Sequence, residues 1–328
     1  MAPKIAISGS GGFIGSHLVS RLLTDGFDLV TFDHGKPAYG EDFYKFRRST
    51  SRHSLLMDTN EMALDLAKET TSSIANSISD CSMFIHLAAY PGVRQSMERP
   101  ENYSRNNLMA FTNVLEACRL AEIPKLLYAS SSSVYGDRGK NIRMSEDLAD
   151  GSGLASYYAG TKWSNEILAK QYPFTKTQCT ALRFFTVYGP WGRPDMAYYS
   201  FARAIRDDIE ITLYDNGKPM RDFTYIDDLT DRLNQLVSVL DTTDISAPTS
   251  LNFGLGVPLS AGSLLHSLET HLGKKAKVVN VQRPSADVES TFSDPTLLNS
   301  LVGDLESTSL DDGIAKFAEW FKEYEFVN

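Results

Sequence analysis

The sequence predicts an α/β fold built on a doubly wound parallel sheet, and three observations support this. Short apolar runs alternate along the first half of the chain with segments whose apolar residues recur at helical spacing. The first of these runs leads directly into a glycine-rich turn and a helix. From about Gly189 the alternation gives way to Pro, Gly and Trp. Because alternating strands and helices favour parallel pairing, we expect a large sheet domain followed by a smaller α/β lobe.

The expected strands occupy residues 4–8, 29–32, 83–87, 125–129 and 180–184. Helical patterns cover 107–121 and 158–171, and an amphipathic helix is expected at 311–324. Residues 221–228 precede another helical pattern that runs to Leu240. We therefore expect a first domain of residues 1–188, to which 222–256 return. The second lobe is expected to comprise 189–221 and 257–328.

Size and composition are those of an ordinary globular protein, with 328 residues, 42% hydrophobic and 22% charged. A net charge of −9 argues against binding to nucleic acid, which favours a basic surface. Three cysteines without C-x-x-C spacing and six scattered histidines predict no structural zinc and no metal catalysis. No leader-like segment precedes the first strand, and no apolar run approaches the roughly 18 residues that span a bilayer. The expectation is a cytoplasmic protein that does not bind membranes.

The glycine-rich turn has the spacing of a dinucleotide-binding site. Gly9, Gly12 and Gly15 follow the first strand and open a helix. Gly9 allows a tight turn, Gly12 lets the backbone approach a pyrophosphate, and Gly15 lets helix and strand pack closely. The second strand ends at Asp33, where an acid accepts hydrogen bonds from the adenosine ribose and repels a 2′-phosphate. This pattern predicts a Rossmann-type domain that binds NAD rather than NADP.

A tyrosine and a lysine four residues apart predict a general base. Tyr158 and Lys162 lie on the same face of the helix expected at 158–171. A phenol has an ordinary pKa near about 10, and a positive charge within about 4–6 Å lowers that value. The pair is therefore expected to supply a phenolate near neutral pH.

The complete order of motifs matches a known enzyme superfamily. After the glycine turn and Asp33 come His86-Leu87-Ala88-Ala89, then the serine run 130–133 before Val-Tyr-Gly, and then Tyr158 with Lys162. Over nearly its whole length the chain resembles the extended short-chain dehydrogenase/reductases. That resemblance implies an NAD-binding Rossmann-type domain and a smaller substrate-binding lobe.

Longer matches narrow the resemblance. Residues 182–196 read Leu-Arg-Phe-Phe-Thr-Val-Tyr-Gly-Pro-Trp-Gly-Arg-Pro-Asp-Met and resemble the signature of UDP-glucuronate 4-epimerases, as do 92–96 and 221–228. Two segments depart from the family pattern. The acidic turn usual after the third strand is here Met57-Asp58-Thr59, and the family's Pro-Gly-Asp-Val is here Pro-Ser-Ala-Asp-Val at 284–288.

The resemblance implies an NAD-dependent enzyme that inverts C4 of a UDP-sugar through a transient 4-keto sugar, and converts UDP-glucuronate to UDP-galacturonate. The implied catalytic residues are the base Tyr158, Lys162, and the hydroxyl donors Ser131 and Ser133. The residues implied to hold NAD are Gly9, Gly12, Phe13, Ile14, Gly15, Asp33, Asp58, Leu87, Ala88, Ala89, Asn107, Ser130, Tyr158, Lys162 and Phe185. The residues implied to hold the substrate are Arg94, Ser131, Ser132, Ser133, Tyr158, Thr186, Arg193, Arg221 and Arg283.

Two tasks are expected of the arginines. Arg94, Arg221 and Arg283 are expected to pair with the UDP diphosphate, because a net-acidic protein must neutralise an anionic ligand locally. Arg193, with Thr186, is expected to hold the sugar carboxylate through charge-assisted hydrogen bonds. Such bonds keep a 4-keto-glucuronate, which is a β-keto acid, from losing carbon dioxide.

Four further expectations concern supporting residues. Asn107 is expected to brace the backbone of the cofactor pocket. Glu166 is expected to pair with Lys162 or, more simply, to be a solvated helix charge. Trp191 is expected to shape the substrate loop or to pack in an interface or the core. Relatives pair the helices expected at 107–121 and 158–171 in a four-helix interface, so the resemblance implies a homodimer.

Several alternatives remain open at the level of sequence. A sugar 4,6-dehydratase is disfavoured, because that group has an Asp-Glu pair where this chain has Ser132 and Ser133. A UDP-glucuronate decarboxylase and a 4-epimerase of a neutral or N-acetylated UDP-sugar are second choices. A non-catalytic NAD-binding sensor is a more distant alternative, because such proteins commonly lose the tyrosine or the lysine.

Overall fold

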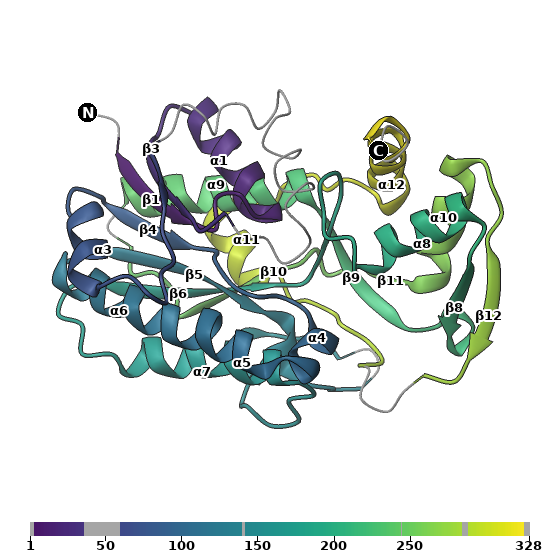
Figure 1. Ribbon diagram of the computed structural model, residues 1–328, viewed down its shortest axis with the longest axis horizontal. Helices are drawn as coiled ribbons and strands as arrows, with labels where there is room; N and C mark the ends of the chain where they lie inside the picture. Colours follow the sequence, from purple (N-terminus) through teal and green to yellow (C-terminus); the bar gives the residue numbers. More distant parts are fainter. Residues whose placement is uncertain (1–2, 36–59, 140–141, 244, 284–287, 325–328) are drawn as a thin grey trace.

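A parallel β-sheet forms the centre of the computed structural model, which describes residues 3–35, 60–139, 142–243, 245–283 and 288–324. In this part of the chain, seven strands pair in parallel (Figure 1). Their order is β10 (Ser250–Phe253), β6 (Gln178–Phe184), β5 (Lys125–Ser131), β4 (Met83–His86), β1 (Lys4–Ser8), β2 (Asp28–Asp33) and β3 (Asn60–Ala63). The chain winds outward from β1 in both directions, so the predicted doubly wound sheet is confirmed.

Helices cover both faces of this sheet (Figure 1). One face carries α1 (Phe13–Thr24), α9 (Ile226–Thr242) and α11 (Thr296–Val302). The opposite face carries α3 (Thr71–Ser77), α4 (Val93–Glu98), α5 (Pro100–Tyr103), the π-helix η2 (Ser104–Met109), α6 (Ala110–Leu120) and α7 (Tyr157–Gln171). Both faces of the strands are therefore buried, which explains why they read as continuous apolar runs.

Side chains of the central strand alternate between two hydrophobic clusters. Ile5 and Ile7 belong to the cluster that contains Leu18 of α1 and Leu233 of α9. Ala6 belongs to the cluster on the other face. Each fully buried leucine or isoleucine stabilises the fold by about 1.5–3 kcal/mol relative to exposure. Burial on both faces fixes the register, because a slip by one residue would exchange the two sets.

The predicted elements agree closely with the observed ones. The strand at 4–8 has the bounds of β1, and the helix predicted at 311–324 is α12 (Leu310–Tyr324). The helix at 158–171 begins one residue earlier, where the Ser156 hydroxyl caps it by accepting from the Ala159 N–H at 3.1 Å. The helix at 107–121 begins instead within the π-helix η2 and continues as α6.

The remaining strands form two small sheets beside the large one. The first contains β11 (Pro258–Ser260), β9 (Met220–Tyr225) and β7 (Thr186–Tyr188), and the second contains β12 (Lys277–Val281) and β8 (Glu210–Tyr214). Helices α8 (Ala197–Asp207), α10 (Ala261–Leu272) and α12 pack with them, and short 3-10 turns are η3 (Ser132–Tyr135), η4 (Glu146–Leu148) and η5 (Asp215–Gly217). Helix α9 packs beside α1 on the large sheet, and β10 is one of the strands of that sheet. We therefore propose the same division into two domains, with 222–256 belonging to the first.

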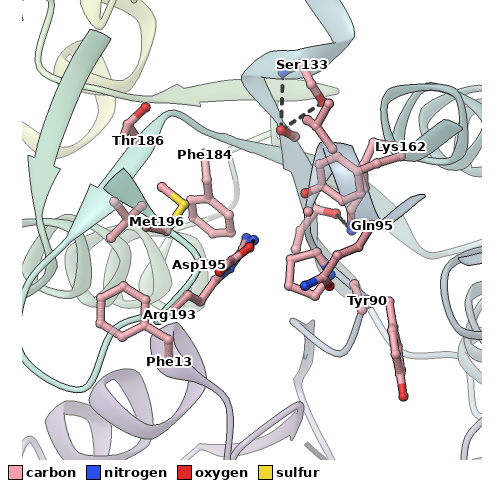
Figure 2. A pocket seen from close by; sticks show the side chains of 18 of the residues that line it. Phe13, Tyr90, Gln95, Ser133, Lys162, Phe184, Thr186, Arg193, Asp195 and Met196 are labelled. Atoms are coloured by element: carbon pink, nitrogen blue, oxygen red, sulfur yellow. Dashed lines mark hydrogen bonds and ion pairs between the residues drawn. The ribbon is translucent and has the colours of Figure 1, made fainter. Parts of the chain in front are cut away.

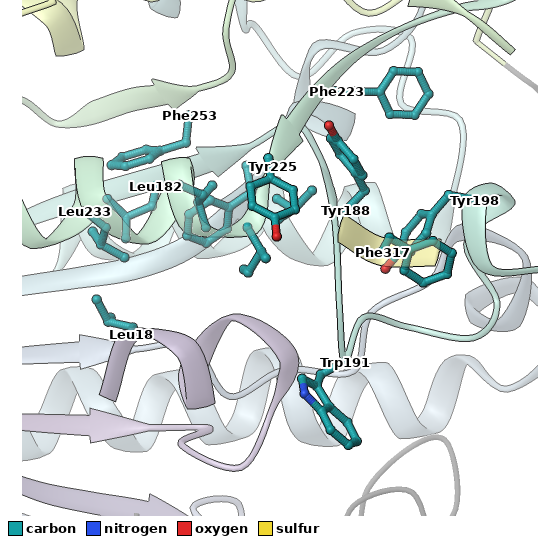
Figure 3. Packing of buried hydrophobic residues seen from close by; sticks show 14 of the residues in the cluster. Leu18, Leu182, Tyr188, Trp191, Tyr198, Phe223, Tyr225, Leu233, Phe253 and Phe317 are labelled. Atoms are coloured by element: carbon teal, nitrogen blue, oxygen red, sulfur yellow. The ribbon is translucent and has the colours of Figure 1, made fainter. Parts of the chain in front are cut away.

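Aromatic residues continue the hydrophobic core from the large sheet into this second part (Figure 3). Trp191 is buried with a φ of 63°, a left-handed conformation that is rare for a bulky side chain. Its ring lies 5.0 Å from that of Trp320 and 4.9 Å from that of Tyr324, both on α12. Of the roles expected for Trp191, the structure therefore shows core packing, and α12 is its anchor.

A buried histidine ends β4 at the edge of the sheet. The Nδ1 atom of His86 lies 2.7 Å from the Ser8 hydroxyl, and its ring stacks on Phe111 at 5.6 Å. Burial, together with the nearby charge of Lys162, lowers the pKa of His86 to about 3. The folded protein therefore holds this imidazole in its neutral form.

Exchange of His86 for glutamine should flatten the acid limb of the stability curve. The unfolded imidazole binds a proton below its ordinary pKa of 6.5, whereas the folded one does so only near about 3, so stability is lost as the pH falls between these values. When the pH falls from about 7.5 to about 5, the free energy of unfolding should decrease in both proteins. We expect the decrease to be about 2 kcal/mol smaller for His86→Gln than for the unmodified protein. Urea unfolding at both pH values measures this. The exposed His266→Gln serves as the control, and equal pH dependence in all three proteins would contradict the assignment.

Candidate active site

One large cavity lies where the carboxyl ends of the central strands meet the second part of the chain. Its volume is about 1180 Å³. The walls come from residues after β1, β2, β4, β5 and β6 on one side, and from β7, α8, β8 and β9 on the other. Figure 2 shows side chains from both sides reaching into it: Lys162, Ser133 and Phe13 come from the first side, and Arg193 and Met196 from the second. In an open parallel sheet this edge is the usual ligand site.

The glycine turn forms one end of the cavity. Gly9 has a φ of 75°, and a Cβ atom there would lie 2.7 Å from the Ala88 backbone nitrogen. A Cβ on Gly15 would lie 2.0 Å from the Gly9 carbonyl oxygen. Neither position has room for a side chain. The turn therefore presents backbone at the N-terminus of the twelve-residue helix α1, where unpaired N–H groups favour an anion such as a pyrophosphate.

Asp33 lies beside this turn, at the end of β2. Its Oδ2 atom accepts the Gly11 N–H at 3.0 Å, and its Oδ1 atom accepts the Gly35 N–H at 2.9 Å. The carboxylate is thus fixed at the cavity wall, next to the segment that would hold a pyrophosphate. This geometry suits a ribose whose two hydroxyl groups donate hydrogen bonds to the Asp33 carboxylate.

The acidic residue implied to hold NAD near the third strand, Asp58, lies outside the described residues and precedes β3, which begins at Asn60. The turn that follows β3 is 64–67, and its acidic residue is Asp65, which lines the cavity and pairs with Arg105. Asp65 is therefore a further candidate for the adenine end of the cavity.

The segment after β4 forms the floor between the two ends of the cavity. Leu87, Ala88 and Ala89 line it, as does Phe185. Asn107 is buried behind this segment: its Oδ1 atom accepts the Tyr90 N–H at 2.7 Å, while its Nδ2 atom donates to the Tyr90 carbonyl at 3.0 Å and to the Thr161 hydroxyl at 3.1 Å. Asn107 is therefore a brace between this segment and α7, and it does not line the cavity.

Tyr158 and Lys162 lie at the centre of the cavity wall, on consecutive turns of α7. The Tyr158 N–H donates to the Ser96 hydroxyl at 3.0 Å, and the Lys162 ammonium donates to the Ala129 carbonyl at 2.8 Å. The ammonium nitrogen lies 5.9 Å from the centre of the Tyr158 ring. The first bond fixes the backbone of α7 at Tyr158, and the second fixes the Lys162 side chain before any ligand is bound.

The electrostatics of this pair differ from the sequence expectation. Burial raises the pKa of the Tyr158 hydroxyl, while the charge of Arg193 and a hydrogen bond with Ser131 act in the opposite direction. Burial also lowers the pKa of Lys162 to about 7, an effect that Glu166 opposes. The lowering of the Tyr158 pKa by Lys162 stays a prediction. The structure adds the charge of Arg193, which sequence spacing alone does not connect to the tyrosine.

The serine run after β5 supplies hydroxyl groups beside Tyr158. Ser131 caps the 3-10 turn η3, and its Oγ atom accepts the Ser133 N–H at 3.2 Å and the Ser133 hydroxyl at 3.0 Å. With both acceptor positions of Ser131 used, its own hydrogen is directed toward Tyr158. Ser132 and Ser133 also line the cavity.

Three of the expected substrate arginines line the cavity, and one does not. Arg193 forms a two-pronged pair with Asp195, with N···O distances of 3.1 and 2.7 Å. Arg94 lies over the Tyr214 ring, and Arg221 donates to the Met220 carbonyl at 2.8 Å. Arg283 lies outside the lining and is paired with Asp215 at 3.6 Å. Its expected contact with the diphosphate stays a prediction.

Thr186 lines the cavity as expected, and a further charged group was missed. Figure 2 shows Thr186 apart from Arg193, on a different part of the wall. Glu166, expected to be a solvated charge, is instead almost buried and pairs with Arg183 at 2.7 Å. The predicted Ser130 hydroxyl donates to the same glutamate at 2.5 Å. A signal did exist in the sequence, because a charged residue inside the apolar strand 180–184 requires a buried partner.

Among the described residues, no group of three or more His, Cys, Asp or Glu side chains is arranged to hold a metal ion. Likewise, no helix within the described ranges combines the length and apolar character needed to cross a membrane.

Comparison with known proteins places this geometry in a family. Residues 5–244 match the model of the NAD dependent epimerase/dehydratase family. A probable UDP-glucuronate 4-epimerase of Rhizobium meliloti is 36% identical over 98% of this chain and 97% of its own length. UDP-glucuronate 4-epimerase 1 of Arabidopsis thaliana is 36% identical over 99% of this chain and 78% of its own.

A solved structure shares the whole architecture. The UDP-glucuronic acid 4-epimerase of Bacillus cereus, in complex with UDP-glucuronic acid and NAD, superposes with a TM-score of 0.84 at 29% identity. The superposition covers 98% of this chain and 99% of the other. The glycine turn, the tyrosine–lysine pair and the serine run thus occur within a fold and a sequence similar throughout to these enzymes, and the chain belongs to the NAD dependent epimerase/dehydratase family.

Proposed function

We propose that this enzyme, an NAD-dependent nucleotide-sugar 4-epimerase, interconverts UDP-glucuronate and UDP-galacturonate. One observation carries the proposal: a single cavity holds a half-buried tyrosine, a serine hydroxyl bonded to it, and an arginine whose charge acts on the same tyrosine. The similarity to UDP-glucuronate 4-epimerases from bacteria and a plant supports the choice of substrate.

The cavity residues fit NAD at the end formed by the glycine turn. Gly9, Gly12 and Gly15 leave the backbone open to a pyrophosphate, and Asp33 is placed to accept ribose hydroxyls. Asp65 takes the place given to Asp58 on the adenine side. When bound, NAD accepts hydride from the sugar C4 and returns it later in the cycle.

Tyr158 removes the proton of the sugar 4-hydroxyl in this proposal. Ser131 donates to the tyrosine oxygen and stabilises its anionic form, and Arg193 does so through its charge. Ser133 donates to Ser131, so a proton can pass along these hydroxyls without rearrangement of the backbone. Lys162, held by the Ala129 carbonyl, keeps a positive charge on the same wall. The 4-keto sugar then turns over, and Tyr158 returns its proton after the opposite face of C4 has been reduced.

The sugar carboxylate needs its own restraint. Loss of carbon dioxide from a β-keto acid requires the carboxylate to stand perpendicular to the ketone. We assign its restraint to Arg193, whose guanidinium Asp195 already orients, and to Thr186. Arg94 and Arg221 on the cavity wall are assigned to the diphosphate.

Exposed apolar side chains favour a homodimer through the helices on one face of the sheet. Met97 of α4 is 64% exposed, Met109 of η2 is 56% exposed and Ile167 of α7 is 47% exposed. Leu168 of α7 is also exposed. Residues of this kind on adjacent helices are typical of a surface covered by another subunit.

Incubation with UDP-glucuronate, without added cofactor, tests the proposed reaction directly. We expect UDP-galacturonate of unchanged mass, resolved by anion-exchange chromatography with mass detection. UDP-glucose, which lacks the carboxylate, is the control substrate and should turn over poorly. A product lighter by carbon dioxide would identify a decarboxylase instead, and turnover of UDP-glucose alone would identify a neutral-sugar epimerase. Absence of any turnover would favour the alternative of a non-catalytic NAD-binding sensor.

Substitution of the base should abolish chemistry and spare binding. Tyr158→Phe removes the hydroxyl and keeps the ring, which packs against Tyr103 at 6.3 Å. We expect kcat to fall by ~10²- to 10⁴-fold, the usual contribution of positioned proton transfer. Calorimetric titration should show that UDP binding is unchanged. A variant with nearly full kcat would exclude Tyr158 as the base.

Removal of the Arg193 guanidinium should release carbon dioxide. Arg193→Ala loses the charge-assisted bonds to the carboxylate, so we expect KM for UDP-glucuronate to rise by about 10- to 100-fold. A UDP-pentose should appear in the same chromatogram. Inhibition by UDP, which lacks the carboxylate, is the matched control and should change little. Epimerisation by this variant with no pentose formed would disprove the assignment.

A further inference from the structure

Glu166 and Arg183 form a buried ion pair one helical turn from Lys162. Their side chains are 10% and 4% exposed. The Arg183 Nε atom donates to Glu166 Oε1 at 3.0 Å, and its Nη2 atom donates to Oε2 at 2.7 Å. This two-pronged geometry satisfies both carboxylate oxygens.

The same carboxylate also holds the end of β5. The Ser130 hydroxyl donates to Glu166 Oε1 at 2.5 Å, and Ser130 lies opposite Arg183 in the register of β5 and β6. The residue before Ser130, Ala129, accepts the Lys162 ammonium at 2.8 Å. Consecutive residues of β5 are thus tied to consecutive turns of α7, through Lys162 and through Glu166.

Arg183 extends these contacts to the serine turn. Its Nη1 atom donates to the Tyr135 hydroxyl at 2.9 Å and to the Glu146 carbonyl at 2.7 Å. Tyr135 ends η3, the 3-10 turn that carries Ser132 and Ser133. The pair therefore contacts both the strand end and the turn from which the catalytic hydroxyls project.

Stability alone gives no reason for charges at this place. Removing an ion from water costs several kcal/mol, and an apolar pair of similar volume often stabilises a fold equally well. The pair is instead located where three elements of the active site meet. A rigid set of directional bonds there fixes relative positions more tightly than apolar packing would.

We propose that Glu166 is a positioning residue of the epimerase: its carboxylate, oriented by Arg183, fixes the end of β5 against α7 and maintains the positive charge of Lys162 beside Tyr158. The inference rests on the proposed function in assigning Lys162 a catalytic task. The structural claim concerns Lys162 itself and is measurable without turnover.

The charge environment of Lys162 favours this role. Tyr158 and Glu166 come from α7, His86 from β4, Tyr128 from β5 and Arg183 from β6. Burial holds His86 and Tyr128 in their neutral forms and lowers the pKa of Lys162, while Glu166 opposes that lowering. Loss of the carboxylate should therefore let Lys162 release its proton at a lower pH.

The test compares Glu166→Gln with a matched control, Glu116→Gln. Glu116 also accepts two bonds from an arginine, Arg119, and one from a hydroxyl, that of Tyr172, but it lies on α6 and outside the cavity lining. Trace labelling by acetic anhydride across a pH series, read by mass spectrometry, gives the pKa of Lys162 in each protein. The alkaline limb of kcat with UDP-glucuronate is the second measurement.

We expect Glu166→Gln to lower the pKa of Lys162 by about one unit and to move the alkaline limb by the same amount. The control should leave both unchanged. Because an unpaired buried Arg183 destabilises the fold, the double variant Glu166→Gln with Arg183→Gln is measured alongside and should lower the pKa of Lys162 in the same direction by a smaller amount, since it also removes a positive charge. An unchanged Lys162 pKa in a folded variant overturns the inference. Failure of the unmodified protein to epimerise overturns the proposed function instead, while the labelling still measures Lys162.

Discussion

Parallel pairing of the central strands is the constraint on which the rest of this structure depends. Ser8 is paired with His86, and His86 with Tyr128, so β1, β4 and β5 end at the same edge of the sheet. The glycine turn, the segment 87–92 and the serine run follow those ends directly. Residues far apart in sequence thereby surround one cavity, and the contact of Gly9 with the Ala88 backbone is a direct result of this register.

Arginines supply positive charge to that cavity, and each is held by a partner. An acidic protein with a net charge of −9 must place its few arginines where an anionic ligand binds. Arg193 is oriented by Asp195, Arg94 lies over Tyr214, and Arg221 contacts a backbone carbonyl. The guanidinium groups are thus preorganised by neutral or singly charged partners, so less conformational freedom is lost when a ligand binds.

The second part of the chain depends on a different set of contacts. Trp191 packs against α12, near the end of the described chain, and so anchors the loop on which Arg193 lies. Asp222, fully buried next to Arg221, accepts the N–H groups of Leu255, Gly256 and Ser293 at 2.9 Å each. These bonds join β9 to the segment that follows β10 and to the segment that contains Ser293. The cavity arginines on this side therefore lie on segments that are held by Trp191 and Asp222, which do not line the cavity themselves.

The sequence by itself determined the sheet, the glycine turn and the helical spacing of Tyr158 and Lys162. Their physical signals are local: apolar runs, backbone positions without room for a Cβ, and one helical turn between two side chains. The third strand has no apolar pattern, so the sequence did not single out Asp65, which lines the cavity after β3. Only the tertiary structure showed that Glu166 is buried against Arg183. Only it showed that the charge of Arg193 counteracts the rise in the Tyr158 pKa that burial causes. Burial and long-range charge depend on how distant segments pack together, and no local pattern encodes that packing.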